Sequence, residues 1–320
     1  MPRSAPQMVL PRMASRTGPV RAVLAALLVA AIGSGCATEA GSDQAEGVRE
    51  ARKAPHAAPP AAPYAGPAGA LAAYAANLRR VEAARVAVAR RWKLARAPLV
   101  APPPPAVKPV ITTRKGFEVE DAEPGLPPVF TTVPVKDRVV FLTMDDGAEK
   151  DPQLLRMMSE LKIPYSAFLS DYLINDNFGY FRQMQDRGVV LGNHTLHHPY
   201  LPGLSYEEQR DEICDQQRKL TKRYGKAPAL FRPPFGNYNG DTLRIAKACG
   251  VKAVPLWAAE AFPDHMEWRE EDQDLHPGDI ILTHFRGREE WKGSMPDLVR
   301  AVMKVITDKG YAVAKLEDYV

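Results

Sequence analysis

The fold is decided by one stretch, residues 139–169, which reads VVFLTMDDGAEKDPQLLRMMSELKIPYSAFL. The apolar run Val139–Thr143 predicts a buried strand, Pro152–Leu161 predicts a helix, and Tyr165–Leu169 predicts a second strand. A strand, a helix and a second strand in succession form the repeating unit of a parallel sheet whose helices lie outside it. The sequence therefore predicts an α/β fold from this stretch outward.

The same alternation continues to the C-terminus. Further strands are expected at residues 189–191, 230–231, 251–256, 279–283 and 311–314, and further helices at residues 180–187, 205–224, 241–249 and 297–309. Ser205 and Glu208 are spaced to form a capping box at the start of the helix over residues 205–224. Six or seven such units predict a closed or nearly closed (β/α) barrel, in which reactive side chains gather at the C-terminal ends of the strands.

Composition divides the chain into two parts. Its 320 residues are 45% hydrophobic and 25% charged, which excludes a mainly disordered chain and a polytopic membrane protein. Residues 1–110 hold 15 Lys and Arg against 5 Asp and Glu, whereas the remaining residues carry a net charge of −6. The net charge of +4 therefore combines a basic arm with a mildly acidic domain, and we expect no nucleic-acid partner.

Residues 1–36 have the features of a signal peptide. Several arginines precede the apolar run Ala22–Ile32, which is too short to span a membrane comfortably but suits a signal-peptide core. Cys36 follows three small residues, as in a bacterial lipoprotein whose cysteine takes up lipid; the alternative is an ordinary cleaved signal. Both predict export, either to the outer face of the cytoplasmic membrane or into the cell wall. Once exported, Cys214 and Cys249 either pair or remain buried free thiols.

Three segments separate this leader from the folded domain. Residues 37–69 are rich in Ala and Pro and predict a disordered spacer. Residues 70–97 predict a basic amphipathic helix, which either lies on anionic lipid or an anionic wall polymer or is a solvated spacer. Residues 98–129 predict a Pro-rich linker with a semi-rigid run at 101–106. These segments are expected to hold the domain, residues 130–320, away from the membrane.

The first strand of the domain ends in two adjacent carboxylates, Asp145 and Asp146, and Gly147 then permits a sharp turn. At the tip of a buried strand, two unpaired charges would each cost several kcal/mol of desolvation. A role as metal ligand or as catalytic base would resolve this cost. The alternative is a solvated Asp-Asp turn that caps the next helix.

The third strand ends in two histidines with metal-ligand spacing. His194 and His198 are four residues apart, so one helical turn is expected to place both imidazoles on one face, while His197 points elsewhere. Two histidines and one carboxylate with open positions form a metal site of the catalytic kind. Alone the spacing is common; it gains weight from the strand-end Asp in the same domain.

Two further strand ends carry charged or titratable side chains. Arg232 precedes two rigid prolines, which indicates an ion pair with an active-site Asp, or alternatively an exposed Arg in a turn. His284 follows the strand at 279–283, where alternation places Leu282 and His284 on one face. If that face is inward, Leu282 lines a pocket with His284 at its lip; the alternative is a surface histidine.

Four motifs, TMDDG, HTxxH, RPPFG and LTH, stand in this order at the strand ends, and the last belongs to the run PGDIILTH. Together they resemble the polysaccharide deacetylases, the NodB-like domain of carbohydrate esterase family four, over residues 130–320. The resemblance implies a distorted (β/α) barrel with fewer than eight full units. It also implies a metal-dependent hydrolase that removes acetyl groups from the N-acetylated sugars of an extracellular polysaccharide, either peptidoglycan or a chitin-like polymer.

The resemblance assigns roles to the polar residues at the strand ends. Asp146, His194 and His198 would bind a divalent metal, zinc in the first place, with cobalt, manganese or nickel as alternatives. Asp145 would be the general base, and Arg232 would hold it ionised and in place. The substrate, an N-acetylated polysaccharide, would be the partner of this site.

The remaining roles concern proton donation and substrate contact. His284 would be the general acid. Phe235, Leu282 and Trp257 would contact the substrate, with the backbone N–H of Phe235 at the oxyanion and Leu282 beside the acetyl methyl. The family usually has an Asp three residues after a strand-end Trp, but here that position is Glu260, which either does the same job or retunes the site. The alternatives are a glycan-binding, catalytically impaired relative and an O-acetyl esterase of the xylan type.

Overall fold

The computed structural model describes residues 67–112 and 124–320. The expected signal peptide with Cys36, and residues 37–66 of the expected spacer, lie outside the described residues. Among the helices of the described part, none is both long enough and apolar enough to cross a membrane.

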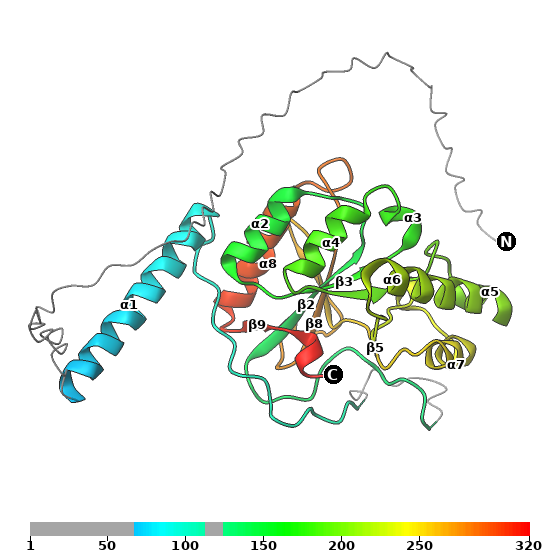
Figure 1. Ribbon diagram of the computed structural model, residues 1–320, viewed down its shortest axis with the longest axis horizontal. Helices are drawn as coiled ribbons and strands as arrows, with labels where there is room; N and C mark the ends of the chain where they lie inside the picture. Colours follow the sequence, from blue (N-terminus) through cyan, green and yellow to red (C-terminus); the bar gives the residue numbers. More distant parts are fainter. Residues whose placement is uncertain (1–66, 113–123) are drawn as a thin grey trace, which may run out of the picture. The chain divides into compact units, whose positions relative to one another are not determined.

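A mostly parallel sheet centred on β2 forms the core (Figure 1). The strands are β1 (Val129–Phe130), β2 (Val139–Asp146), β3 (Ser166–Leu169), β4 (Val190–Asn193), β5 (Val254–Pro255), β6 (Ala259–Ala261), β7 (Met266–Trp268), β8 (Ile280–His284) and β9 (Ala312–Ala314). Every residue of β2 is buried, which explains why its sequence is apolar on both faces instead of alternating. β2 pairs with β3 on one side and with β8 on the other, and β4 continues the sheet beyond β3.

The remaining strands carry the sheet round toward closure. β8 pairs in parallel with β6, and β6 forms an antiparallel hairpin with β7. β5 precedes β6 in the chain and pairs with β1. Two single bridges, Leu230 to Ala253 and Asn193 to Phe231, then connect this region back to β4. The ring therefore closes through short and irregular contacts, and the expected distorted (β/α) barrel is confirmed.

Helices cover the outside of the sheet (Figure 1), and α2 and α8 lie side by side. They are α2 (Pro152–Leu161), α3 (Asp171–Ile174), α4 (Phe178–Asp186), α5 (Tyr206–Arg210), α6 (Gln216–Tyr224), α7 (Gly240–Ala248) and α8 (Met295–Asp308). The expected helix over residues 205–224 is interrupted, because a π-helical turn, Asp211–Asp215, separates α5 from α6. Its capping box is confirmed: Ser205 N donates to the Glu208 carboxylate at 2.8 Å, and Ser205 Oγ accepts from Glu208 N.

A disulfide joins Cys214 in the π-helical turn to Cys249 at the end of α7, with the two Cα atoms 5.4 Å apart. The sequence left open whether these cysteines pair or remain free thiols, and the structure shows that they pair. The bond ties α7 to the turn that carries Glu212, a residue that supports the histidine-bearing loop described below.

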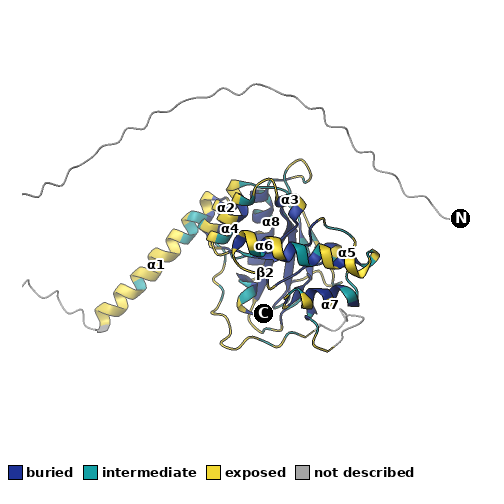
Figure 2. Ribbon diagram, turned by 45° about the vertical axis from the view of Figure 1, so that its right-hand side comes forward, coloured by how far each residue is buried: buried dark blue, intermediate teal, exposed yellow. Residues whose placement is uncertain are grey.

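The C-terminal part of the N-terminal arm contacts the domain formed by residues 130–320. Helix α1 (Pro67–Arg91) begins before residue 70 and ends at Arg91 instead of residue 97, because Lys93 adopts a left-handed conformation and reverses the chain. Figure 2 shows that most of α1 is exposed, but Trp92 is buried and donates to Glu160 of α2 at 2.6 Å. Leu99 then bridges to Ala312 of β9. The structure therefore places residues 92–101 against the domain, where the end of the basic helix and the start of the Pro-rich linker were expected.

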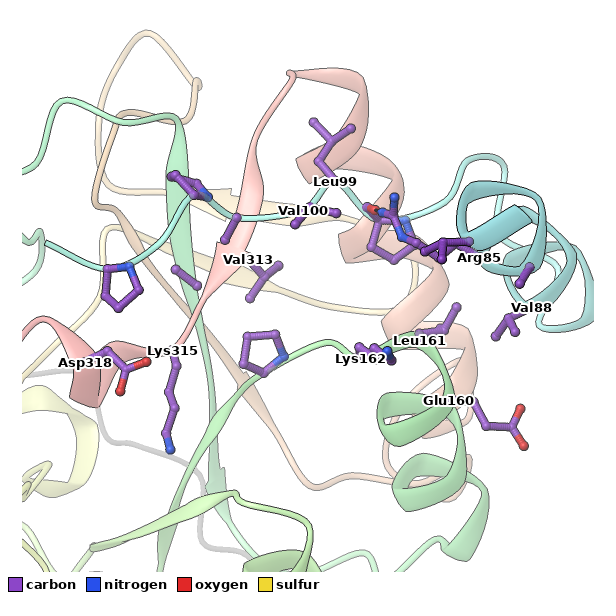
Figure 3. Close-up of a pocket in the computed structure, with 18 of the residues that line it drawn as sticks. Arg85, Val88, Leu99, Val100, Glu160, Leu161, Lys162, Val313, Lys315 and Asp318 are labelled. Carbon is purple, nitrogen blue, oxygen red and sulfur yellow. Dashed lines mark hydrogen bonds between the residues drawn. The ribbon is translucent and has the colours of Figure 1, made fainter. Parts of the chain in front are cut away.

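A cavity of about 690 Å³ opens between α1, this Pro-rich segment and the end of β9 (Figure 3). Its apolar wall includes Val88, Leu99, Val100, Leu161 and Val313. None of the residues expected to form the active site lines it, so the chemistry lies elsewhere, at the C-terminal ends of the strands.

Candidate active site

Two carboxylates form the end of β2. Asp145 and Asp146 are each 2% exposed. Asp145 stands opposite His284 of β8 in the strand register, and Asp146 stands opposite Leu169 of β3. The parallel register therefore brings the end of β2 beside the ends of its two neighbours, so the polar side chains of all three strands share one edge of the sheet.

Asp146 meets two histidines at this edge. Its Oδ1 atom lies 3.5 Å from Nε2 of His194 and 3.5 Å from Nε2 of His198. The other ring nitrogen of His194, Nδ1, donates to the carbonyl of Arg232 at 2.6 Å, because a carbonyl oxygen can only accept. Nε2 of His194 is therefore left with its lone pair facing Asp146, as a metal ligand requires.

The surroundings of these three side chains fit a divalent metal. Oδ1 of Asp146 is buried and has no hydrogen-bond partner among the described residues, which is costly unless a cation satisfies it. Burial raises the pKa of Asp146, but the neighbouring His194 and nearby cationic groups outweigh it and hold the pKa well below its usual range. Burial, together with His194, lowers the pKa of His198 to about 4, so this imidazole is neutral near pH 7. Two imidazoles and one carboxylate are a donor set that suits zinc and other first-row divalent ions.

The two histidines do not lie on a helical turn, so that expectation was wrong. Residues 194–198 form a loop in which Thr195 and His198 have φ values of 69° and 59°, the left-handed region that non-glycine residues avoid. Side chains hold this loop: Asn193 Oδ1 accepts from Thr195 N at 2.9 Å, and the Glu212 carboxylate accepts from the backbone N–H groups of residues 196 and 197. The imidazoles converge because the surrounding structure enforces this strained loop.

Arg232 is fully buried and makes the expected ion pair with Asp145. Its Nη1 lies 2.8 Å from Asp145 Oδ1 and also donates to Thr143 Oγ1 at 2.9 Å. Its Nε and Nη2 donate to the carbonyls of Pro255 and Leu256 at 2.8 and 3.1 Å. A guanidinium held by four acceptors cannot swing away, so Asp145 keeps both its charge partner and its orientation.

His284 is paired with Glu260 across the β6–β8 contact. Nδ1 of His284 lies 3.2 Å from Glu260 Oε1, which directs the opposite nitrogen, Nε2, away from Glu260. Burial lowers the pKa of His284, but Glu260 and the two strand-end aspartates outweigh it and raise the pKa above its ordinary value. The imidazole is therefore suited to carry a proton near neutral pH.

Comparisons with known proteins agree with this geometry. The family model for polysaccharide deacetylases matches residues 132–254, a range that includes both aspartates, both histidines and Arg232. An uncharacterized protein of Streptomyces coelicolor is 39% identical over 207 residues, which cover 64% of this chain and 82% of that protein. The chain belongs to the polysaccharide deacetylase family.

Two further similarities concern sequence and fold. A peptidoglycan-N-acetylglucosamine deacetylase of Bacillus cereus is 29% identical over 200 residues, covering 58% of this chain and 90% of that enzyme. A CE4 family pseudoenzyme from Bacillus anthracis has the same fold, with a TM-score of 0.51 at 20% identity over 60% of this chain and 69% of that chain.

Three apolar or aromatic residues expected to contact substrate stand near the polar cluster of this polysaccharide deacetylase. The ring of Phe235 is 58% exposed and lies 4.6 Å from the ring of His198. Trp257 lies close to two guanidinium groups, Arg232 at 5.7 Å and Arg269 at 4.6 Å from its ring centroid. Leu282 is buried in β8, and the strand register sets it opposite Thr143 and Glu260.

Sequence reasoning missed two residues beside the site. Arg286 donates through Nη2 to Asp146 Oδ2 at 2.6 Å. The ring of Trp291 lies 6.1 Å from that of His284 and 5.3 Å from that of Phe262. Arg286 had a usable signal, since a residue two positions after His284 on an extended segment points to the same side. Trp291 had none, because it lies in an irregular loop.

Proposed function

We propose that the protein is an exported, metal-dependent hydrolase that removes acetyl groups from N-acetylated sugars of an extracellular polysaccharide, with peptidoglycan as the first choice. One observation carries this proposal: the orphaned Oδ1 of Asp146 faces the two histidines, and an Arg-held Asp145 and a Glu-held His284 stand on the same edge of the sheet. Those are the groups that amide hydrolysis requires, a metal cradle, a base and an acid.

Asp146, His194 and His198 would hold the metal, and zinc is the ion that best matches their donor atoms. When bound, a divalent ion supplies Lewis-acid polarisation of the acetyl carbonyl and acidifies water. The protein's contribution is to present three ligand atoms from two strand ends without a fourth protein ligand in the described cluster. A cluster of this kind leaves access for water and substrate.

Asp145 would accept the proton of the attacking water. Its Oδ1 is engaged by Arg232, so Oδ2, which lies 3.7 Å from His194 Nε2, is the atom that faces the metal cradle. A carboxylate at this position can take up the proton that the attacking water releases. The ion pair with Arg232 therefore orients the proposed base.

His284 would donate a proton to the departing sugar amine, because an amine leaves poorly unless it is protonated. The contact of Nδ1 with the Glu260 carboxylate at 3.2 Å leaves Nε2 as the nitrogen that would face the reacting groups. Glu260 stands where the family usually has an Asp. Its contact with His284 indicates that the longer side chain can also orient this histidine. Leu282, Trp257 and the backbone N–H of Phe235 would enclose the acetyl group.

Peptidoglycan is supported by the similarity to the Bacillus cereus enzyme, whose name states that substrate, and by the signal peptide that the sequence predicts over residues 1–36. A lipid anchor at Cys36 would hold the protein at the outer face of the cytoplasmic membrane, and fatty-acid labelling of wild type and Cys36→Ala tests it: equal labelling contradicts the anchor. The basic helix α1 would face anionic lipid or wall polymer, and the exposure of most of its residues is compatible with such a contact.

The decisive experiment measures acetate release by the purified protein from peptidoglycan, chitin oligomers and acetylated xylan. Activity on an N-acetylated polymer that disappears on chelation and returns with zinc or cobalt supports the proposal. His194→Ala is expected to be inactive, and His197→Ala is its matched control, because His197 lies in the same loop but is exposed and pairs with Glu212. Release from xylan alone would make the protein an O-acetyl esterase, and no release from any polymer would overturn the proposal.

A further inference from the structure

The two carboxylate oxygens of Asp146 have different surroundings. Oδ1 faces the histidine nitrogens at 3.5 Å and has no hydrogen-bond partner among the described residues. Oδ2 accepts a hydrogen bond from Nη2 of Arg286 at 2.6 Å. Only one oxygen of this carboxylate is therefore presented to the metal cradle, and the other is already engaged.

Arg286 is fixed in the position from which it makes this contact. Its Nε lies 3.1 Å from Glu290 Oε2, and its backbone N–H donates to the carbonyl of His284 at 3.1 Å. The backbone beside it is tied to the end of β2, because Phe285 N donates to the carbonyl of Asp145 at 3.1 Å and Glu149 N donates to the carbonyl of Phe285 at 3.0 Å. The start of the loop after β8 is thus held near the end of β2, and the guanidinium lies between Asp146 and Glu290.

The spacing of this loop explains why Arg286 reaches the site. Phe285 is fully buried in the core, so its two neighbours, His284 and Arg286, point to the opposite side. Arg288 continues along the same loop, but its guanidinium pairs with Asp297 at the start of α8 at 2.9 Å. Two arginines of one loop therefore have separate carboxylate partners, and only the first meets a residue of the metal cradle.

We propose that Arg286 is a positioning residue that restricts Asp146 to binding the metal through Oδ1 alone. A carboxylate can bind a metal with one or with two oxygens, and the second oxygen occupies a further coordination position. Catalytic metal sites need such a position to remain open for water or substrate. By engaging Oδ2, Arg286 keeps that position available. This inference rests on the proposed metal-dependent function.

Cobalt(II) in place of zinc makes the open position visible, because its visible absorption changes when an added ligand enters the coordination sphere. Acetate, the reaction product, is the probe. We expect the cobalt-loaded wild type to respond to acetate. Arg286→Gln is expected to keep one cobalt per chain, while its affinity for acetate and its kcat fall by about 10–100-fold, the usual effect of removing an outer-shell partner. Arg286→Lys should restore part of the acetate response, since an ammonium group still donates to Oδ2.

Two further variants keep the test decisive. Glu290→Gln changes an exposed residue that only steadies Arg286, and it should shift the acetate response in the same direction by a smaller factor. Arg288→Gln is the matched control and should behave as wild type. An unchanged acetate response in Arg286→Gln overturns the inference. The inference is also overturned if Arg286→Gln loses cobalt and activity to the same extent and if excess cobalt restores both. Arg286 would then only stabilise metal binding. Failure of the proposed function has a different signature, a folded wild type that neither binds cobalt nor releases acetate.

Discussion

Two groups of side chains in the described residues bring histidine and carboxylate groups close enough to share one ion. They differ in burial and in what their imidazoles face. The first is Asp146, His194 and His198 at the C-terminal edge of the sheet. The second is Glu270, Asp272 and His276, in the segment between β7 and β8. The residue types are nearly the same, so composition alone does not separate a catalytic centre from an ion-pair network.

The difference lies in what each imidazole faces. His194 is 2% exposed, one ring nitrogen is engaged by a carbonyl, and the other faces the orphaned oxygen of Asp146. His276 is 32% exposed and has carboxylates near both nitrogens, Asp272 at 3.1 Å from Nε2 and Asp279 at 3.5 Å from Nδ1. The imidazole of His276 is thus partly exposed among carboxylates, whereas that of His194 is buried with Nε2 facing the strand-end aspartates. Burial and the orientation of the ring nitrogens therefore separate the proposed metal ligand from the ion-pair network.

The largest expected effect tests directly whether the first group binds a metal and the second does not. His194→Ala removes a ligand of the first group and should abolish both metal retention and acetate release. His276→Ala removes the central residue of the second group and should leave both unchanged, because its carboxylate partners are accessible to solvent or engaged elsewhere. Metal content after dialysis, measured by mass spectrometry, and acetate release check the pair. Loss of metal in His276→Ala alone would reverse the assignment of the two groups.

The next effect separates metal binding from proton transfer within the first group. Asp145→Asn keeps the shape of the side chain and removes its capacity to take up a proton. We expect kcat to fall by about 10²–10⁴-fold, the usual contribution of general base catalysis, with metal content unchanged. Steady-state kinetics and metal analysis test this. A variant that lost its metal along with its activity would make Asp145 a ligand instead of a base.

Much of this site was predictable because the end of a strand can be recognised from local sequence, and in a parallel sheet it also indicates where the following side chains lie. The apolar run before Asp145 predicts a buried strand, and parallel strands end at one edge of the sheet, so the four motifs converge without knowledge of any contact. The capping box at Ser205 was predictable for a similar reason, since it depends on residues three positions apart.

The features that sequence reasoning missed depend on distant parts of the chain. The helical turn expected at His194–His198 was wrong because Glu212, from a separate π-helical turn, caps a strained loop instead. Arg286 was missed because alternation after β8 indicates the side to which it points but not its partner, Asp146, which lies 140 positions away. The contact of Trp92 with Glu160 was missed because the apolar period of the expected helix over residues 70–97 indicates a face but not the surface on which that face packs.

A third effect concerns stability. It tests whether metal binding by the first group depends on the disulfide between Cys214 and Cys249. Replacing Cys214 and Cys249 by Ala opens a loop of 35 residues and should lower the free energy of unfolding by about 3–4 kcal/mol, the loop-closure value. Urea unfolding of oxidised wild type and of the double variant measures it. Metal content under native conditions should stay the same, since Glu212 holds the histidine loop through side-chain contacts of its own. A parallel loss of metal would show that the disulfide itself shapes the cradle.

The smallest effect is a shift in pH dependence. In the proposed mechanism His284 acts in its protonated form, so activity should fall as the pH rises through the pKa of this residue. Burial lowers that pKa, but Glu260 and the strand-end aspartates raise it, and the net shift is upward from 6.5. Glu260→Gln removes a charge that raises the pKa, so the falling limb of the pH profile for kcat should move to lower pH. His284 then loses its proton earlier on the alkaline side.

Glu267→Gln is the matched control for this shift, because Glu267 stands opposite Glu260 in the β6–β7 hairpin but its side chain is 64% exposed and lies beside His265. The control profile should coincide with that of wild type. If Glu260→Gln lowered kcat equally at every pH, Glu260 would act only by holding the imidazole in place. If the limb moved to higher pH, His284 would not be the group that donates the proton, because removal of a neighbouring anion cannot raise the pKa of an imidazolium.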